Sequence, residues 1–224
     1  GGFTGTTFVP IVTKGRGENE GSNLDMNYVL GIRNTDNVLA ADFEEDNLSA
    51  TSGLNHPIVG TTVLQNNVWY HAAVTYNLSD GYLRLYLNGN LESSVLVGTT
   101  RWPEYSSLQH AGLGTAMNST GVTAGYFAGR IDEARIWNRA LSLSEIKSGM
   151  SQEIISGTGL LGRWGLNNGS GTSATNSVAG SPNGTLTNGP TWATGQTFPN
   201  EPWALQLNGT SNFVNFGSAP GLAT

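Results

Sequence analysis

The feature that most constrains the fold is a period of two in two neighbouring segments, 69–76 and 82–87. Every second residue would lie on one face of a strand: Tyr70, Ala72, Val74 and Tyr76 in the first segment, and Leu83, Leu85 and Leu87 in the second. Successive side chains of a strand point to opposite faces, so a period of two predicts two strands. Ser79-Asp80-Gly81 between them predicts the turn of an antiparallel hairpin.

Short apolar segments separated by turn residues continue through most of the chain. The further predicted strands are 9–12, 28–32, 38–43, 91–96, 126–137, 203–207 and 212–216. Pro10 predicts that the first of them is an edge strand or a strand start. The 31 glycines and the charged fraction of only 12% are typical of strands joined by tight turns. One short helix is expected, because Ser142 to Glu145 form a capping-box pattern and Ile146 and Met150 lie four apart. The fold class is therefore all-β with one short helix.

The charge and composition exclude several functions. A net charge of −6 disfavours binding to the phosphate backbone of a nucleic acid, whereas hard cations, neutral glycans or simple solubility remain compatible. The chain has no cysteine, which removes disulfides, thiolate zinc sites and cysteine nucleophiles. The sequence contains no run of 18 apolar residues, so no segment is predicted to insert into a membrane. The first residues, Gly1-Gly2-Phe3, resemble the interior of a longer chain.

Three sequence blocks resemble one family. The blocks are Trp69-Tyr70-His71-Ala72-Ala73-Val74-Thr75-Tyr76, Leu83-Arg84-Leu85-Tyr86-Leu87-Asn88-Gly89 and Phe127-Ala128-Gly129-Arg130-Ile131-Asp132-Glu133-Ala134-Arg135-Ile136-Trp137-Asn138-Arg139-Ala140-Leu141-Ser142. In this order and spacing they resemble the LamG-like jelly-roll family of the laminin G/concanavalin A-like superfamily, over about residues 8–150. The resemblance implies a two-sheet antiparallel jelly-roll sandwich. It also implies a non-catalytic binding or adhesion module, secreted or at the cell surface and bacterial, from a large exported protein with tandem repeats.

The order of the parts is permuted relative to that family. Residues 1–150 resemble the C-terminal two-thirds of a repeat, residues 151–202 form a connecting segment rich in Gly, Asn, Ser and Thr, and residues 203–224 resemble the first strands of a following repeat. An unpaired sandwich edge is prone to association, so we expect residues 159–217 to complete the sandwich. They could do so within the chain, or by donation to another copy, which would give self-association by strand exchange. The remaining alternative is a fragment of a tandem array.

The resemblance also implies calcium, as a structural cofactor. Asp132 occupies a family position that often supports a calcium ion, and the alternative is a strand Asp hydrogen-bonded to a neighbouring loop. Similarity to pentraxins implies a second site at Asp36 and Asn37, completed by a loop that contains Asn118. This chain departs from that pattern, because Ala116 and Asn118 replace two carboxylates. Turn formation by Asp36 and Asn37 is the alternative.

Catalytic motifs are weak. Asp42 and Glu44 would share a strand face, as the paired carboxylates of a glycosidase do, but a solvated end of the acidic strand 42–46 is favoured. The Glu-x-Asp-x-Glu strand of sandwich glucanases does not occur, nor does a Gly-x-Ser-x-Gly or His-Glu-x-x-His motif. The chain is therefore predicted not to be an enzyme.

Exposed aromatic residues are the remaining candidates for binding. Trp102 and Tyr105 lie in the predicted loop 100–105, where they could stack on the apolar face of a sugar ring or pack within the loop. A glycan or another cell-surface component is thus the expected partner. The alternatives are a structural repeat or filament subunit assembled by strand complementation, and an accessory domain of a secreted hydrolase.

Overall fold

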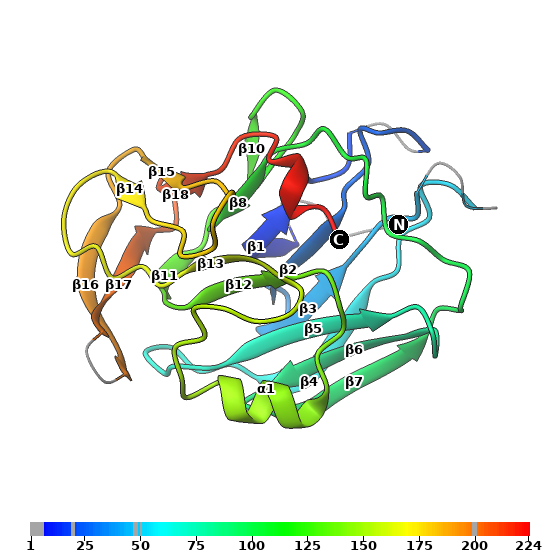
Figure 1. Ribbon diagram of the computed structural model, residues 1–224, viewed down its shortest axis with the longest axis horizontal. Coiled ribbons are helices and arrows are strands. Elements are labelled where there is room, and N and C mark those ends of the chain that lie inside the picture. The colour runs from blue at the N-terminus through cyan, green and yellow to red at the C-terminus, as the bar shows by residue number, and fades with distance from the viewer. Residues whose placement is uncertain (1–6, 19–20, 47–48, 50, 199–200) are drawn as a thin grey trace.

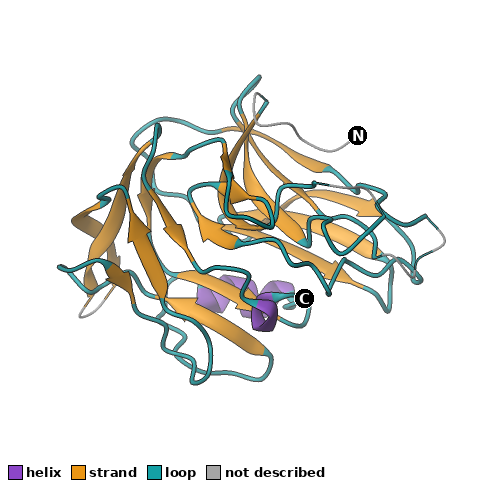
Figure 2. Cartoon of the chain, turned by 90° about the horizontal axis from the view of Figure 1, so that it is seen from above, coloured by secondary structure: helices purple, strands orange, loops and turns teal. Residues whose placement is uncertain are grey.

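The computed structural model describes residues 7–18, 21–46, 49, 51–198 and 201–224. Strands dominate them, with one α-helix and one 3-10 turn (Figure 2). The all-β prediction is confirmed. No helix in the described ranges is long and apolar enough to cross a membrane.

The largest sheet is antiparallel and has eight strands in the order β14-β15-β18-β8-β1-β2-β3-β4. In that order the strands are Ser173–Ala174, Gly184–Thr187, Phe213–Asn215, Ala111–Leu113, Phe8–Lys14, Tyr28–Arg33, Val38–Asp42 and Ile58–Val63. Strands from both ends of the chain therefore share one sheet.

Smaller antiparallel sheets lie opposite the large one. They are β5-β6-β7, β12-β13 and β11-β17-β16, and β9 and β10 form a separate hairpin. The strands are β5 Ala72–Asn77, β6 Tyr82–Leu87, β7 Asn90–Leu96, β9 Ala116–Met117, β10 Thr123–Ala124, β11 Ala128–Ile131, β12 Ala134–Trp137, β13 Leu160–Trp164, β16 Thr191–Phe198 and β17 Glu201–Asn208. The two layers form the jelly-roll sandwich that the sequence predicted.

The helix α1 (Leu143–Gly149) begins as its sequence predicted. The Ser142 side chain accepts a hydrogen bond from the Glu145 N–H, and the Glu145 side chain accepts one from the Ser142 N–H, so the capping box is complete. Ile146 is the apolar residue that the helix buries. The 3-10 turn η1 (Pro220–Leu222) lies near the C-terminus.

Residues 159–217 pair with the first part of the same chain. Strand β18 pairs with β8, with Val214 opposite Leu113, and β17 pairs with β11, with Leu205 opposite Ile131. Figure 1 shows the orange and red C-terminal strands beside the green strands from the middle of the chain. The expected connecting segment 151–202 is itself structured, since it contains β13, β14, β15, β16 and the start of β17. Its polar, glycine-rich composition had concealed these short strands.

Two hydrophobic cores fill the space between the layers. The hairpin core consists of buried residues from β3, β4 and β6 and the residue after β3, namely Leu39, Ala41, Phe43, Ile58, Leu83, Leu85 and Leu87. The tail core consists of Ala111, Leu113, Ile131, Ala134, Ile136, Trp164, Leu166, Ala174, Leu186, Leu205, Leu207, Val214, Phe216 and Leu222. The predicted apolar face of segment 69–76 packs on the hairpin core, as expected.

Two strand predictions need correction. Strand β1 is central rather than an edge, but it pairs with β8 only from Val12 onward, and its register on β2 shifts between Pro10 and Val12. Pro10 therefore removes no donor from the β8 ladder. The predicted strand 126–137 is two strands, because Glu133 has a left-handed backbone (φ 53°) that ends β11 and redirects the chain into β12.

Candidate functional site

The segment between β7 and β8 presents the predicted aromatic residues; residues 98–108 are called the Trp102 loop. Its backbone is tied to the strand-like segment that follows β3. The Asp46 N–H donates to the Trp102 carbonyl (2.8 Å), the Glu104 N–H donates to the Glu44 carbonyl (2.9 Å), and Glu45 forms a β-bridge with Pro103. These contacts hold the loop in a defined position on the acidic stretch.

Trp102 and Tyr105 are 54% and 55% exposed. Two other large apolar side chains in this part of the surface are also exposed, Leu54, whose carbonyl accepts the Glu45 N–H, and Leu108. An indole or phenol ring that keeps over half of its surface in water gains free energy when an apolar partner covers it. The Trp102 loop can therefore contact a ligand with an apolar face.

Glu45 forms a buried support beneath this loop. Its carboxylate is fully buried and accepts hydrogen bonds from the Thr51 hydroxyl (2.6 Å) and the Arg101 guanidinium (3.2 Å), and it lies 2.7 Å from His56 Nε2. A charge at this depth is stable only when it is paired and hydrogen-bonded. Because Arg101 immediately precedes Trp102, this network fixes the start of the exposed surface.

The acidic stretch is buried and not solvated as the sequence suggested. All four carboxylates, Asp42, Glu44, Glu45 and Asp46, lie in the interior, as does Asp25. Asp42 Oδ1 accepts the His56 N–H (2.8 Å), and Glu44 accepts hydrogen bonds from the Met26 N–H and the Asn55 amide. Burial raises the pKa of Asp42 to about 7. Hydrogen bonds from the backbone N–H groups of loops offset the free-energy cost of burying these carboxylates. No local sequence pattern predicts those donors.

Asp42 and Glu44 are therefore poorly placed for glycoside hydrolysis. A catalytic carboxyl pair must flank a bond of a substrate that enters from solvent. Both residues are almost inaccessible and are held by protein donors. This arrangement argues only against catalysis by these two carboxylates, and the absence of enzyme activity stays a prediction.

The structure does not bring together the residues of the predicted pentraxin-like calcium site. Asp36 forms a two-point ion pair with Arg33 (2.9 and 2.5 Å), and Asn37 adopts φ 56° in the turn between β2 and β3. Asn118 lies at the opposite end of β1, where its carbonyl accepts the His110 N–H and its side chain accepts the Val122 N–H. The seven residues of β1 separate the two groups by roughly 20 Å. A single ion cannot contact both groups of residues, so they do not form the predicted calcium site.

Asp132 occupies the turn between β11 and β12. Its Oδ2 accepts the Gln196 N–H from β16 (2.9 Å), whereas its buried Oδ1 has no hydrogen-bond donor among the described residues. Burial raises the pKa of Asp132 to about 6. The adjacent Glu133 turns away to pair with Arg135 and Arg163. No group of three His, Asp or Glu side chains in the described ranges is arranged to hold a metal.

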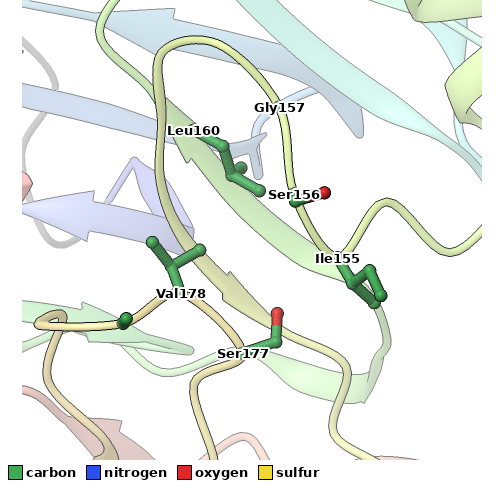
Figure 3. A pocket seen from close by; sticks show the side chains of 7 residues that line it. Ile155, Ser156, Gly157, Leu160, Ser177 and Val178 are labelled. Atoms are coloured by element: carbon green, nitrogen blue, oxygen red, sulfur yellow. The ribbon is translucent and has the colours of Figure 1, made fainter.

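A pocket of about 200 Å³ lies between the segment after α1 and the segment before β15. Figure 3 shows Ile155, Leu160 and Val178 lining it, together with the hydroxyls of Ser156 and Ser177. It holds no titratable side chain, so it offers no acid, base or metal ligand. We assign it no chemistry.

Sequence reasoning missed the residues that order the Trp102 loop. His56 and Arg101 are far from Glu45 in sequence, and neither belongs to a motif. The only available signal was the cluster of four carboxylates beside a central strand, where burial demands partners. That signal does not identify the partners.

Comparison with known proteins identifies the family. Residues 4–147 match the concanavalin A-like lectin/glucanases superfamily, and the chain belongs to this superfamily. No curated protein sequence matches the chain.

Three solved structures are similar to this chain. A Bacteroides ovatus protein proposed to bind carbohydrate shares 16% identity with a TM-score of 0.49, and the alignment covers 90% of this chain and 51% of that one. The native heptameric SAP-like pentraxin from Limulus polyphemus shares 17% (TM-score 0.37; 62% and 66% covered). A Clostridium thermocellum S-layer domain-containing protein shares 25% (TM-score 0.32; 57% of each chain covered). The chain thus spans between half and two-thirds of the length of each.

Proposed function

We propose that this chain is a non-catalytic carbohydrate-binding module whose Trp102 loop stacks against a sugar ring. The observation that carries the proposal is the exposure of Trp102 and Tyr105 on a loop that the buried acidic stretch anchors. Aromatic rings with a polar edge suit sugars, because the ring face covers C–H groups while the indole N–H or phenol O–H meets hydroxyls. Membership of a superfamily that includes lectins supports the same class of ligand.

Burial of the acidic residues supports a binding role over hydrolysis. A sugar at the Trp102 loop would meet backbone and aromatic surface, while Asp42 and Glu44 stay beneath it. We also propose that the module acts outside the cell, secreted or at the cell surface, where a glycan ligand would be accessible.

A glycan array probed with the labelled protein tests the proposal, followed by calorimetric titration of the glycans that bind. Trp102→Ala and Tyr105→Ala should each weaken binding by about tenfold, equivalent to about 1.4 kcal/mol. Trp69→Ala is the matched control, since Trp69 is also partly exposed but precedes β5, outside the Trp102 loop. The bound oligosaccharide should remain uncleaved after prolonged incubation.

Failure of the array to detect any glycan would contradict the proposal, as would equal affinities for the wild type and both loop variants. Light scattering provides a second measurement. Pairing of the tail within one chain favours a 23.6 kDa monomer. Oligomers that grow with concentration would instead support a structural repeat assembled by strand exchange.

Structural calcium at Asp132 is a second proposal about the same module. The buried Oδ1 without a protein donor provides one carboxylate oxygen, and carbonyl, amide or water oxygens would complete the coordination. Calcium should raise the melting temperature of the wild type relative to EDTA, and Asp132→Asn should abolish most of that difference. An identical melting temperature in calcium and EDTA would argue against a structural ion.

A further inference from the structure

A polar groove lies between the outward-facing side of the β5–β6 hairpin and the start of α1. Its volume is about 370 Å³, within the roughly 300–1,000 Å³ range of small-molecule pockets. Thr75 of β5 and Tyr86 of β6 line it from the hairpin, and Ser142 and Glu145 line it from the helix. The strand register places Thr75 directly opposite Arg84, which also lines the groove.

Two hydroxyl side chains in this groove have no protein partner. Thr75 and Tyr86 are only 9% and 5% exposed, and no described residue hydrogen-bonds to either hydroxyl. Both hydroxyl oxygens are open to the water of the groove, because neither belongs to the buried polar atoms that lack a partner. A polar molecule that enters the groove would therefore replace water at two hydroxyls without having to break protein contacts.

The charged side chains of the groove are already paired. Arg84 donates to Asp80 (2.9 Å) and lies 4.8 Å from the centre of the Tyr82 ring, which holds its guanidinium in place. Glu145 accepts a hydrogen bond from Arg139 (2.7 Å) and is engaged in the capping box. The hydrogen bond from Arg84 lowers the pKa of Asp80, so this pair is ionised at neutral pH.

These pairs select against a charged ligand. An anion or a cation would have to compete with an existing ion pair, whereas a neutral ligand can use the lone pairs and N–H groups that remain. The groove therefore combines unpartnered hydroxyls with fixed, mutually neutralised charges.

We propose that the groove binds one neutral, polyhydroxylated ring, of the size of a hexopyranose unit. Sugar hydroxyls both donate and accept, which matches the Thr75 and Tyr86 hydroxyls and the rim formed by Asp80 and Arg84. The groove shares no residue with the Trp102 loop. It is a second binding site, and it does not depend on the function proposed for that loop.

Heteronuclear NMR of the labelled full chain tests the proposal. The probes are the methyl glycosides of glucose, galactose and mannose, with methyl glucuronide as the charged counterpart. At least one neutral glycoside should cause saturable shifts of backbone amides in β5, β6 and the first turn of α1. Methyl glucuronide should bind more weakly than methyl glucoside.

The hydroxyl-deleting variants Thr75→Val and Tyr86→Phe should each weaken this binding by about three- to tenfold, the value of one hydrogen bond. Tyr70→Phe is the control that also deletes a tyrosine hydroxyl, because Tyr70 packs on the hairpin core and does not line the groove. A melting temperature within a few degrees of the wild type shows that each variant is folded.

Three results would overturn the proposal: no shifts with any neutral glycoside, unchanged affinity in both hydroxyl variants, or tighter binding of the glucuronide. Trp102→Ala separates the two sites. This variant should leave the glycoside-induced shifts of β5, β6 and α1 unchanged. The proposal for the groove can therefore be refuted while the proposal for the Trp102 loop is supported, and the reverse.

Discussion

The hairpin core and the tail core differ in how much of the chain is needed to close them. Every buried residue of the hairpin core lies between Leu39 and Leu87, so local hairpins bring most of it together. The tail core joins residues 111–136 to residues 164–222, and most of its members come from the later stretch. One half of the sandwich thus depends on short-range pairing, whereas the other depends on the return of the tail. Closing a longer loop costs more chain entropy, so the tail core is expected to be the weaker link.

The largest effect should come from truncating Trp164 in the tail core. Its ring is fully buried, lies 4.3 Å from the ring of Phe216, and its indole N–H donates to the Pro182 carbonyl. Trp164→Ala should lower the free energy of unfolding by about 3–5 kcal/mol. It should also increase hydrogen exchange and proteolysis of residues 160–217 before the rest of the chain.

Leu85→Ala provides the matched change in the hairpin core, where Leu85 is also fully buried. It should lower the stability by about 2–5 kcal/mol without selectively releasing the tail. Selective proteolysis of the tail in both variants would show that the two cores do not differ in this way.

A smaller effect is expected from Lys14, which anchors the tail to β1. Its buried ammonium donates to the carbonyls of Ser107, Gln109 and Ser218, each at 2.9 Å. Burial lowers the pKa of Lys14 to about 8, so the group remains charged at neutral pH. Lys14→Met leaves these carbonyls without their donor and should cost about 2–3 kcal/mol in chemical denaturation.

Lys147→Met serves as the control for Lys14, because Lys147 is exposed on α1 and should change stability by less than about 0.5 kcal/mol. A loss of equal size in both variants would mean that the three carbonyl contacts contribute little.

The smallest effect concerns Asp42, beside the hairpin core. Its pKa is about 7 in the folded chain and near 3.8 in the unfolded chain, so the folded state holds the extra proton between these values. Stability should therefore fall as the pH rises from about 4 to about 7. Asp42→Asn should flatten this dependence and raise the melting temperature at pH 8, equivalent to about 1 kcal/mol.

Asp80→Asn is the comparison for Asp42, because Asp80 is largely exposed and its pKa is lowered, not raised. It should leave the fall in stability between pH 4 and pH 7 intact. If Asp42→Asn also leaves it intact, another buried carboxyl is responsible.

Local patterns predicted the hairpin half well. Strand β6 has the predicted bounds, and the three alternate leucines Leu83, Leu85 and Leu87 face the core because a period of two allows only that choice. The capping box predicted the start of α1 for a similar reason, since its two hydrogen bonds span three residues. Interactions that close within a few residues can be inferred from sequence.

The tail half could not be predicted in the same detail. Strands β14 and β15 are short and rich in Gly, Ser and Thr, so their composition is that of a loop. They become strands because β18 pairs with β15 and with β8 in one sheet. The sequence likewise could not predict that Trp102 is exposed, since an indole in a loop can face either solvent or the core.

The sequence by itself determined the all-β class, the β5–β6 hairpin, the capped helix and the resemblance to the superfamily, because each rests on local periodicity or on contiguous motifs. Only the tertiary structure decided that the acidic stretch is buried, that Asp36 and Asn118 are apart, and that α1 covers the hairpin beside Thr75 and Tyr86. Those outcomes depend on which distant segments supply hydrogen-bond donors, apolar cover or a facing surface. The free energy of a side chain is set by these neighbours, and the order of residues along the chain does not reveal them.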